Sequence, residues 1–191
     1  MNRYVPFAQK KIFDGNSKFN VSVVPTGNWR GMVMRTDTAP FDNPKVRKAV
    51  RLAVDRQELV DLVMGGAATV ACDTPVAPSD QYRLNMKCGQ DINGAKKLLK
   101  EAGYPNGIEM TIHVSTKEPT WPTIAEVMQQ QLAKAGIKAD IQMTPSKSYW
   151  KETWMKKAVA MTRWNERPAD SALHEIYHSG AKWNESFYKS A

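Results

Sequence analysis

The sequence predicts an α/β fold in which a mixed sheet is flanked by helices. Residues 108–114 and 137–143 place an apolar side chain at every second position, as in half-buried strands. The stretch 123–136 between them has apolar residues three and four apart, as in an amphipathic helix. The chain has 191 residues, of which 42% are hydrophobic and 24% charged, as in globular proteins. Pro, Gly and polar linkers separate the elements, so we expect residues 1–191 to form a single α/β domain.

Two short strands are expected near the start of the chain. The stretches FNVSVVP (19–25) and GMVMRT (31–36) are rich in apolar and β-branched residues, with the turn-like TGNW between them. A helix then begins near Pro44, with Asp42 or Asn43 as its cap. Its apolar face should enter the core and consists of Val46, Ala49, Val50, Ala53 and Val54.

Two more helices share these start and stop signals. Asp55 and Glu58 are spaced as a capping box for a helix over 56–64, which a Gly-Gly pair ends. After a Pro-rich loop, Asp91 or Asn93 caps a further helix. The buried stripe and closing glycine of that helix are Ala95, Leu98, Leu99, Ala102 and Gly103.

The two alternating strands enclose the amphipathic helix, which predicts a right-handed crossover and therefore a parallel strand pair. A last helix is expected over residues 148–158. Trp150 and Trp154 lie four residues apart on one face of it, so we expect both to enter the core.

The charge distribution and the two cysteines indicate the type of surface and the redox compartment of the protein. The net charge is +8, but Lys and Arg are scattered without an arginine-rich tract, so we expect a solvated basic surface rather than nucleic-acid binding. No apolar run has the length of a membrane span, and the first residues show no signal-peptide pattern. Cys72 and Cys88 bracket a loop with little apolar area, which favours a disulfide and an oxidising compartment over two free thiols.

The order of several segments resembles one family. The segments are APFDNPKVRKAVRLAVDRQELVDLVMGG, DINGAKKLLKEAGYPNG, AEVMQQQLAKAGIKADIQ and RWNERPAD. Together they resemble the extracellular solute-binding proteins of family 5, the peptide- and nickel-type binding proteins of bacterial ABC importers. The resemblance implies a type II periplasmic-binding-protein fold, of which this chain is most of the second lobe. It also implies a periplasmic or extracytoplasmic location, no catalysis and no cofactor.

The same resemblance implies the partners and the site. A ligand, peptide or other small polar solute, would be captured between this lobe and a first lobe and delivered to ABC permease subunits. In peptide-binding members a Trp enters the cleft and an Asp often follows three residues later; here Trp164 is followed by Arg167. An Arg in that place favours an acidic ligand group, unless it only pairs with Asp170. Weaker candidates for ligand contact are Asn165, Trp183 and Arg30.

One motif is typical of a different class of protein, the zinc peptidases. The stretch HEIYH, with His174, Glu175 and His178, fits the H-E-x-x-H pattern of zinc peptidases. A zinc site needs a third ligand, and only Glu185 is an acid among the residues that follow. We therefore expect an ordinary helix without metal, in which Leu173, Ile176 and Tyr177 pack. A zinc metallopeptidase stays one alternative function, and a basic nucleic-acid-interaction domain stays the other.

Overall fold

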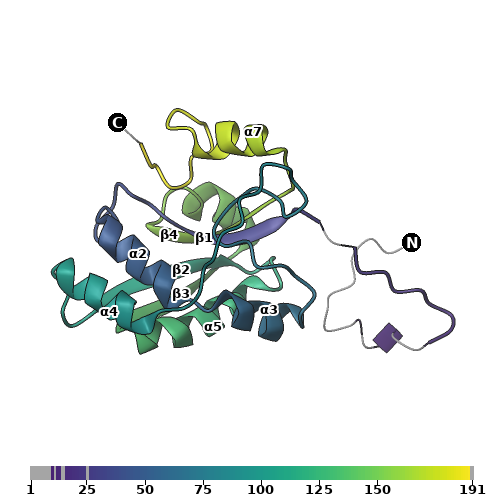
Figure 1. Ribbon diagram of the computed structural model, residues 1–191, viewed down its shortest axis with the longest axis horizontal. Helices are drawn as coiled ribbons and strands as arrows, with labels where there is room; N and C mark the ends of the chain where they lie inside the picture. The colour runs from purple at the N-terminus through teal and green to yellow at the C-terminus, as the bar shows by residue number, and fades with distance from the viewer. Residues whose placement is uncertain (1–9, 11, 14–15, 25, 190–191) are drawn as a thin grey trace.

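The computed structural model describes residues 10, 12–13, 16–24 and 26–189. Four strands of this described part form one sheet in the order β1-β4-β2-β3 (Figure 1). The strand β1 (Trp29–Met34) is antiparallel to β4 (Val159–Trp164), and β2 (Ile108–Ser115) is parallel to both β4 and β3 (Ile137–Thr144). The sheet is therefore mixed, and the predicted parallel pair is confirmed.

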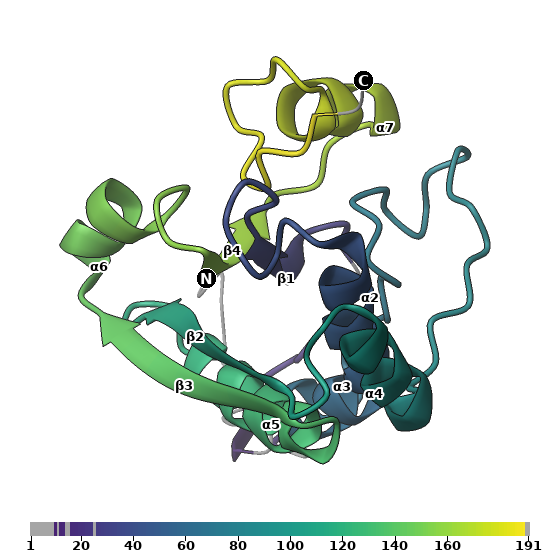
Figure 2. The ribbon, with the colours of Figure 1, turned by 90° about the vertical axis from the view of Figure 1, so that its left-hand side faces the viewer.

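Four helices gather on one face of the sheet, as Figure 2 shows: α2 (Pro44–Ala53), α3 (Arg56–Met64), α4 (Ile92–Glu101) and α5 (Trp121–Lys134). The crossover helix α5 lies against β2 and β3, and α2 packs between α4 and α5. Between these layers lies a continuous core of apolar side chains with the fully buried Trp121 among them. Within the described ranges, none of the helices is long and apolar enough to cross a bilayer.

The predicted helix starts are confirmed, with one difference in the capping box. Asn43 caps α2 through the N–H of Lys45, and Asp91 caps α4. Asp55 caps α3, but Glu58 does not return a hydrogen bond to Asp55. The backbone N–H of Asp55 donates instead to the amide oxygen of Gln131 on α5, at 3.1 Å, and the amide nitrogen of Gln131 donates to the Glu58 carboxylate at 2.6 Å. These two hydrogen bonds join α3 to α5, and no local sequence pattern could indicate them.

Three predicted elements need correction. The described residues 19–24 of the first predicted strand are not in a strand, and Pro25 lies outside the described residues. The second strand begins two residues earlier than predicted, at Trp29. The helix expected over 148–158 is instead a short turn, α6 (Ser146–Ser148), followed by the π-helical turn η1 (Tyr149–Thr153). This shorter element leaves Trp150 partly exposed, at 38%.

The start of the parallel pair depends on a close backbone approach. Gly107 precedes β2 with a φ of +88°, and Gly136 precedes β3 with a φ of +81°. A Cβ atom on Gly107 would lie 1.8 Å from the carbonyl oxygen of Gly136, far inside van der Waals contact. Glycine is therefore needed at position 107 for two reasons. The backbone is left-handed there, and a side chain would collide with the backbone of Gly136 where β2 and β3 begin side by side.

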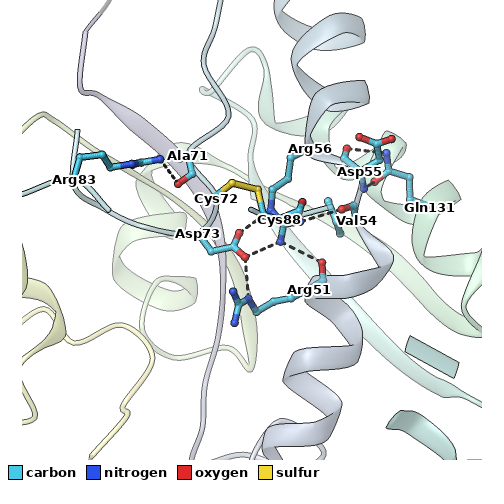
Figure 3. A network of polar contacts seen from close by, with 10 residues as sticks. All are labelled: Arg51, Val54, Asp55, Arg56, Ala71, Cys72, Asp73, Arg83, Cys88 and Gln131. Atoms are coloured by element: carbon cyan, nitrogen blue, oxygen red, sulfur yellow. Dashed lines mark hydrogen bonds and ion pairs between the residues drawn. A yellow bond between two sulfur atoms is a disulfide. The ribbon is translucent and has the colours of Figure 1, made fainter. Parts of the chain in front are cut away.

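The loop between α3 and α4 is held by a disulfide and by the partly exposed carboxylate of Asp73 (Figure 3). Cys72 and Cys88 are bonded, as predicted, with their Cα atoms 5.3 Å apart. Asp73 accepts hydrogen bonds from both Nε (2.9 Å) and Nη2 (2.7 Å) of Arg56, and another from Nε of Arg51 (2.8 Å). Burial acts against ionisation, but the contacts with Arg56 and then Arg51 hold the pKa of Asp73 below its ordinary value. The loop is thus fastened to α2 and α3 at the disulfide.

Removing the disulfide should destabilise the fold. The bridge spans 16 residues, so a Cys72→Ser/Cys88→Ser variant should lose about 3 kcal/mol of unfolding free energy in urea titrations. Thiol titration of the unfolded, unreduced wild type should detect no free thiol. Two reactive thiols in that titration would contradict the bridge and the argument for an oxidising compartment.

Candidate functional site

The pairing of β1 with β4 divides the predicted site residues between two faces. Residues directly opposite one another in an antiparallel pair lie on the same face, and neighbours along a strand alternate. Trp164 therefore shares a face with Thr162, whereas Arg30, opposite Arg163, shares the other face with the core residue Met161. Arg30 is thus separated from Trp164 by the sheet, which the sequence did not indicate.

Trp164, Trp183 and Arg167 come together at the end of β4, and we call these three residues the Trp–Arg cluster. The ring centroids of the two tryptophans are 5.6 Å apart. The guanidinium carbon of Arg167 lies 5.5 Å from the centroid of the Trp164 ring and 5.7 Å from that of Trp183. Such distances favour cation–π attraction with both rings. Two flat rings and a planar cation can contact an acidic or planar group.

The ion-pair partner of Arg167 is Glu175, and not Asp170 as the sequence analysis had considered. Nη1 of Arg167 donates to one carboxylate oxygen of Glu175, and the hydroxyl of Ser171 donates to the other at 3.1 Å. The side chains of the pair stay 30% and 34% exposed. A partly exposed pair of this kind contributes little to stability.

Glu185 fixes the position of Trp183 in the cluster. Its side chain is buried and accepts hydrogen bonds from the hydroxyl of Thr162 (2.5 Å), from Nε1 of Trp164 (3.1 Å) and from Nε1 of Trp154. Thr162 and Trp164 belong to β4, while Glu185 lies two residues after Trp183 along the chain. The carboxyl group therefore holds the C-terminal segment against the sheet, which brings the two indole rings together.

Burial raises the pKa of Glu185, and the three hydrogen bonds act in the opposite direction without cancelling the effect. A carboxyl group with a raised pKa in the folded state stabilises the fold most when it is protonated. That contribution is present below the ordinary value of 4.5 and is lost as the pH rises through the folded-state pKa. Glu185 is a residue that sequence reasoning missed as a structural anchor, because no local motif surrounds it.

A second contact joins the end of β4 to the start of β1. The backbone N–H of Glu166 donates to the side-chain oxygen of Asn28 (2.8 Å), and the carboxylate of Glu166 accepts the N–H of Gly27 (2.9 Å). Gly27 is required here, because an added Cβ would lie 2.5 Å from the Glu166 side chain. Asn165, one of the predicted contacts, is exposed beside this junction. It lies near the Trp–Arg cluster in the chain but is not a member of it.

The HEIYH stretch forms a π-helical turn, η2 (Leu173–Tyr177), and not the predicted ordinary helix; it follows α7 (Ala169–Ala172). Ile176 is buried as expected, but Leu173 and Tyr177 are 49% and 42% exposed. Both carboxylate oxygens of Glu175 are occupied, by Arg167 and Ser171, so this residue is not placed as a general base for a zinc-bound water. Across the part of the chain that the structure describes, no three His, Cys, Asp or Glu side chains are grouped for a metal.

Substituting Glu185 tests the anchor. Glu185→Ala should lower the unfolding free energy by about 1–3 kcal/mol, because it leaves the fully buried hydroxyl of Thr162 without its acceptor. Glu185→Gln should abolish the pH dependence due to the carboxyl group, since the wild type loses stability as the pH rises above about 4.5 and the amide does not titrate.

Thermal melts at several pH values measure both effects, with the exposed Glu126→Gln on α5 as the matched control. Parallel pH profiles for the wild type and Glu185→Gln would show that the buried carboxyl does not titrate as described. An unchanged stability of Glu185→Ala would show that the C-terminal segment is held by other contacts.

Comparisons with known proteins agree with this architecture. The family profile of the bacterial extracellular solute-binding proteins, family 5 (Middle), matches residues 2–184. The glutathione-binding protein GsiB of Escherichia coli (strain K12) is 38% identical over 138 residues, which cover 72% of this chain and 27% of that protein. GsiB of Pectobacterium atrosepticum is 36% identical over the same length. The chain therefore spans about a quarter of the length of the curated relatives that it matches.

Solved structures show the same fold. The periplasmic binding protein DppA of Helicobacter pylori, in complex with the peptide STSA, superposes with a TM-score of 0.81 at 27% identity, over 97% of this chain and 38% of that one. CtaP of Listeria monocytogenes, an ABC transporter substrate-binding protein, has a TM-score of 0.88 at 21% identity, over 97% and 40% of the two chains. The chain has the fold of type II periplasmic binding proteins and belongs to the bacterial extracellular solute-binding proteins of family 5.

Proposed function

We propose that this chain is the second ligand-binding lobe of a two-lobe solute-binding protein that serves an ABC importer. The observation that carries the proposal is the Trp–Arg cluster at the end of β4, with two indole rings around one partly exposed guanidinium. Family membership supports it, because the relatives are named as binding proteins for glutathione and, in DppA, hold a peptide. The first lobe would close over this cluster once a ligand is bound.

The ligand we propose is peptide-like and carries a carboxylate. Arg167 already holds the carboxylate of Glu175 at a partly exposed position, so the site is suited to a second carboxylate of the same geometry. On ligand binding, the guanidinium would exchange Glu175 for the ligand acid, while Ser171 keeps its hydrogen bond to Glu175. The two tryptophans would shield the new ion pair from water, which strengthens it.

The role we propose is binding and release without catalysis. Glu175 is engaged by Arg167 and Ser171, and the described residues hold no metal-ligand group, so no observation favours the zinc peptidase alternative. None favours a nucleic-acid-interaction domain either. The partners would be a first lobe and the permease subunits of the importer, in the periplasm or at the outer face of the membrane. The disulfide fits such an oxidising compartment.

The test is the affinity of the whole two-lobe protein for glutathione and for short peptides, measured by titration calorimetry. Arg167→Ala should weaken binding by about 2–5 kcal/mol, because a buried carboxylate of the ligand would lose its partner. Arg167→Lys should restore only part of the affinity, since an ammonium lacks the planar fork. The melting temperature should change little, because the Arg167–Glu175 pair is partly exposed.

The matched control is Arg163→Ala. Arg163 also lies at the end of β4 and also pairs with a glutamate, Glu118 at 2.8 Å, but it is on the opposite face of the sheet. Its substitution should leave the affinity within about twofold of the wild type. Equal affinities of wild type and Arg167→Ala would refute the assigned contact, and an absence of binding to every small peptide would refute the proposed ligand class.

A further inference from the structure

Residues 165–168, between β4 and α7, carry Arg167 and have no regular secondary structure, so their position depends on contacts made at either end. On the β4 side, Glu166 is bound to the residues just before β1, as described above. On the α7 side, the backbone N–H of Ala169 donates to Oδ2 of Asp80 at 3.1 Å, although the two residues are 89 positions apart in the chain. Arg167 therefore lies between two attached residues, and Asp80 supplies one of the attachments.

Asp80 belongs to the disulfide loop, which we define as residues 72–88. The direction of its carboxylate is fixed within this loop, because the other oxygen, Oδ1, accepts the backbone N–H of Tyr82 at 2.8 Å. The backbone is held as well. The N–H of Asp80 donates to the carbonyl oxygen of Ala77 (3.0 Å), and the carbonyl oxygen of Asp80 accepts the N–H of Arg83 (3.0 Å). A group that is oriented in advance loses little entropy when it makes a further contact.

The disulfide loop is cross-linked at several points (Figure 3). The bond between Cys72 and Cys88 joins its two ends. The guanidinium of Arg83 donates to the carbonyl oxygens of Val76 (2.5 Å) and of Ala71 (2.8 Å), so it connects the middle of the loop to its start. The carboxylate that holds α7 is therefore carried by a cross-linked loop and not by a free stretch of chain.

The same loop also supports the attachment on the β4 side. Gly27, whose N–H donates to Glu166, lies against Ala77, since an added Cβ on Gly27 would be 2.7 Å from the Cβ of Ala77. Ala77 and Ala169 are only 4% and 5% exposed, although neither belongs to the core cluster under the sheet. Neighbouring segments at this junction cover them. The disulfide loop thus supports the segment of Arg167 at both ends.

We propose that Asp80 is a positioning residue for the ligand site. Through Ala169 it sets the direction of Arg167 and thereby the preference for a ligand that carries a carboxylate, and the disulfide keeps Asp80 in place for this role. The inference rests on the proposed function, in which Arg167 binds the ligand acid. A two-pronged contact between guanidinium and carboxylate needs a fixed direction of the guanidinium, so it is more sensitive to a lost attachment than the remaining contacts of a ligand are.

The test is the affinity of the whole protein for glutathione and for its diethyl ester, in which both carboxylates are neutral. Trialanine and trialanine amide form a second pair of probes. The ratio of the two affinities within a pair measures the preference for an acid. Asp80→Ala should lower this ratio on the order of fivefold, as for one lost hydrogen bond, and change the affinity for the neutral probe little.

Two further outcomes separate positioning from other roles of Asp80. Asp80→Asn should give a ratio between those of the wild type and Asp80→Ala, because its single amide oxygen can accept only one of the two N–H groups in the original geometry. A purely electrostatic role predicts the opposite sign, since the loss of a negative charge favours an anionic ligand. A raised ratio in both variants would overturn the proposal.

The matched control is Gln81→Ala, which changes the exposed neighbour of Asp80 in the same loop and should stay within about twofold of the wild type. The Cys72→Ser/Cys88→Ser variant should lower the ratio as Asp80→Ala does. Combining the two should add little, because both act through one loop. Hydrogen exchange gives a readout without ligand: residues 165–172 should exchange faster in Asp80→Ala than in Gln81→Ala.

The outcomes distinguish this inference from the proposed function. A wild type that binds no probe, or that binds acid and neutral forms equally, would refute the ligand contact assigned to Arg167, and the role of Asp80 with it. A wild type that prefers acids, together with an unchanged ratio or unchanged exchange in Asp80→Ala, would overturn the positioning role alone. Full additivity of Asp80→Ala and the cysteine variant would overturn the role given to the disulfide.

Discussion

The candidate site depends on one buried carboxyl group. Glu185 accepts hydrogen bonds from Thr162 and Trp164 of β4 and from Trp154 after η1, so three segments meet at one side chain. The segment that carries Trp183 is also held by a backbone hydrogen bond from Thr36, after β1, to Ser186 (2.8 Å), but its hydrogen bonds to β4 are those of Glu185. We expect the two indole rings at Arg167 to lose their fixed positions when this carboxyl group is removed. The raised pKa of Glu185 follows from its burial in this place. Above the folded-state pKa the ionised Glu185 therefore stabilises the fold less than the protonated group does, while it still holds the Trp–Arg cluster together.

The sequence predicted the helix layer and the parallel pair well, because their signals are local. The Asn43 and Asp91 caps and the alternation in 108–114 and 137–143 each act within one element. The disulfide was also predictable, since the loop between the cysteines has little apolar area to hold it. The resemblance to family 5 placed Trp164 and Arg167 in a site, and the structure does bring them together with Trp183.

What the sequence could not predict are contacts between residues far apart in the chain. Gln131 replaces Glu58 in the cap of α3, and Glu175 replaces Asp170 as the partner of Arg167. The register of β1 against β4 sets Arg30 on the face opposite Trp164, so one predicted site is in fact two separate places. The helix predicted over 148–158 fails for a related reason. Trp150 and Trp154 still contact each other, at 5.6 Å, but a π-helical turn and the bond from Trp154 to Glu185 decide where they point.

The most direct test of the account is a crystal structure of the whole protein with a bound peptide-like ligand. The account predicts a ligand carboxylate within hydrogen-bond distance of the Arg167 guanidinium, between the rings of Trp164 and Trp183, with Glu175 released from Arg167. A ligand that is bound elsewhere while Arg167 still holds Glu175 would contradict it. In that case the Trp–Arg cluster would be a structural feature of the lobe and not its binding site.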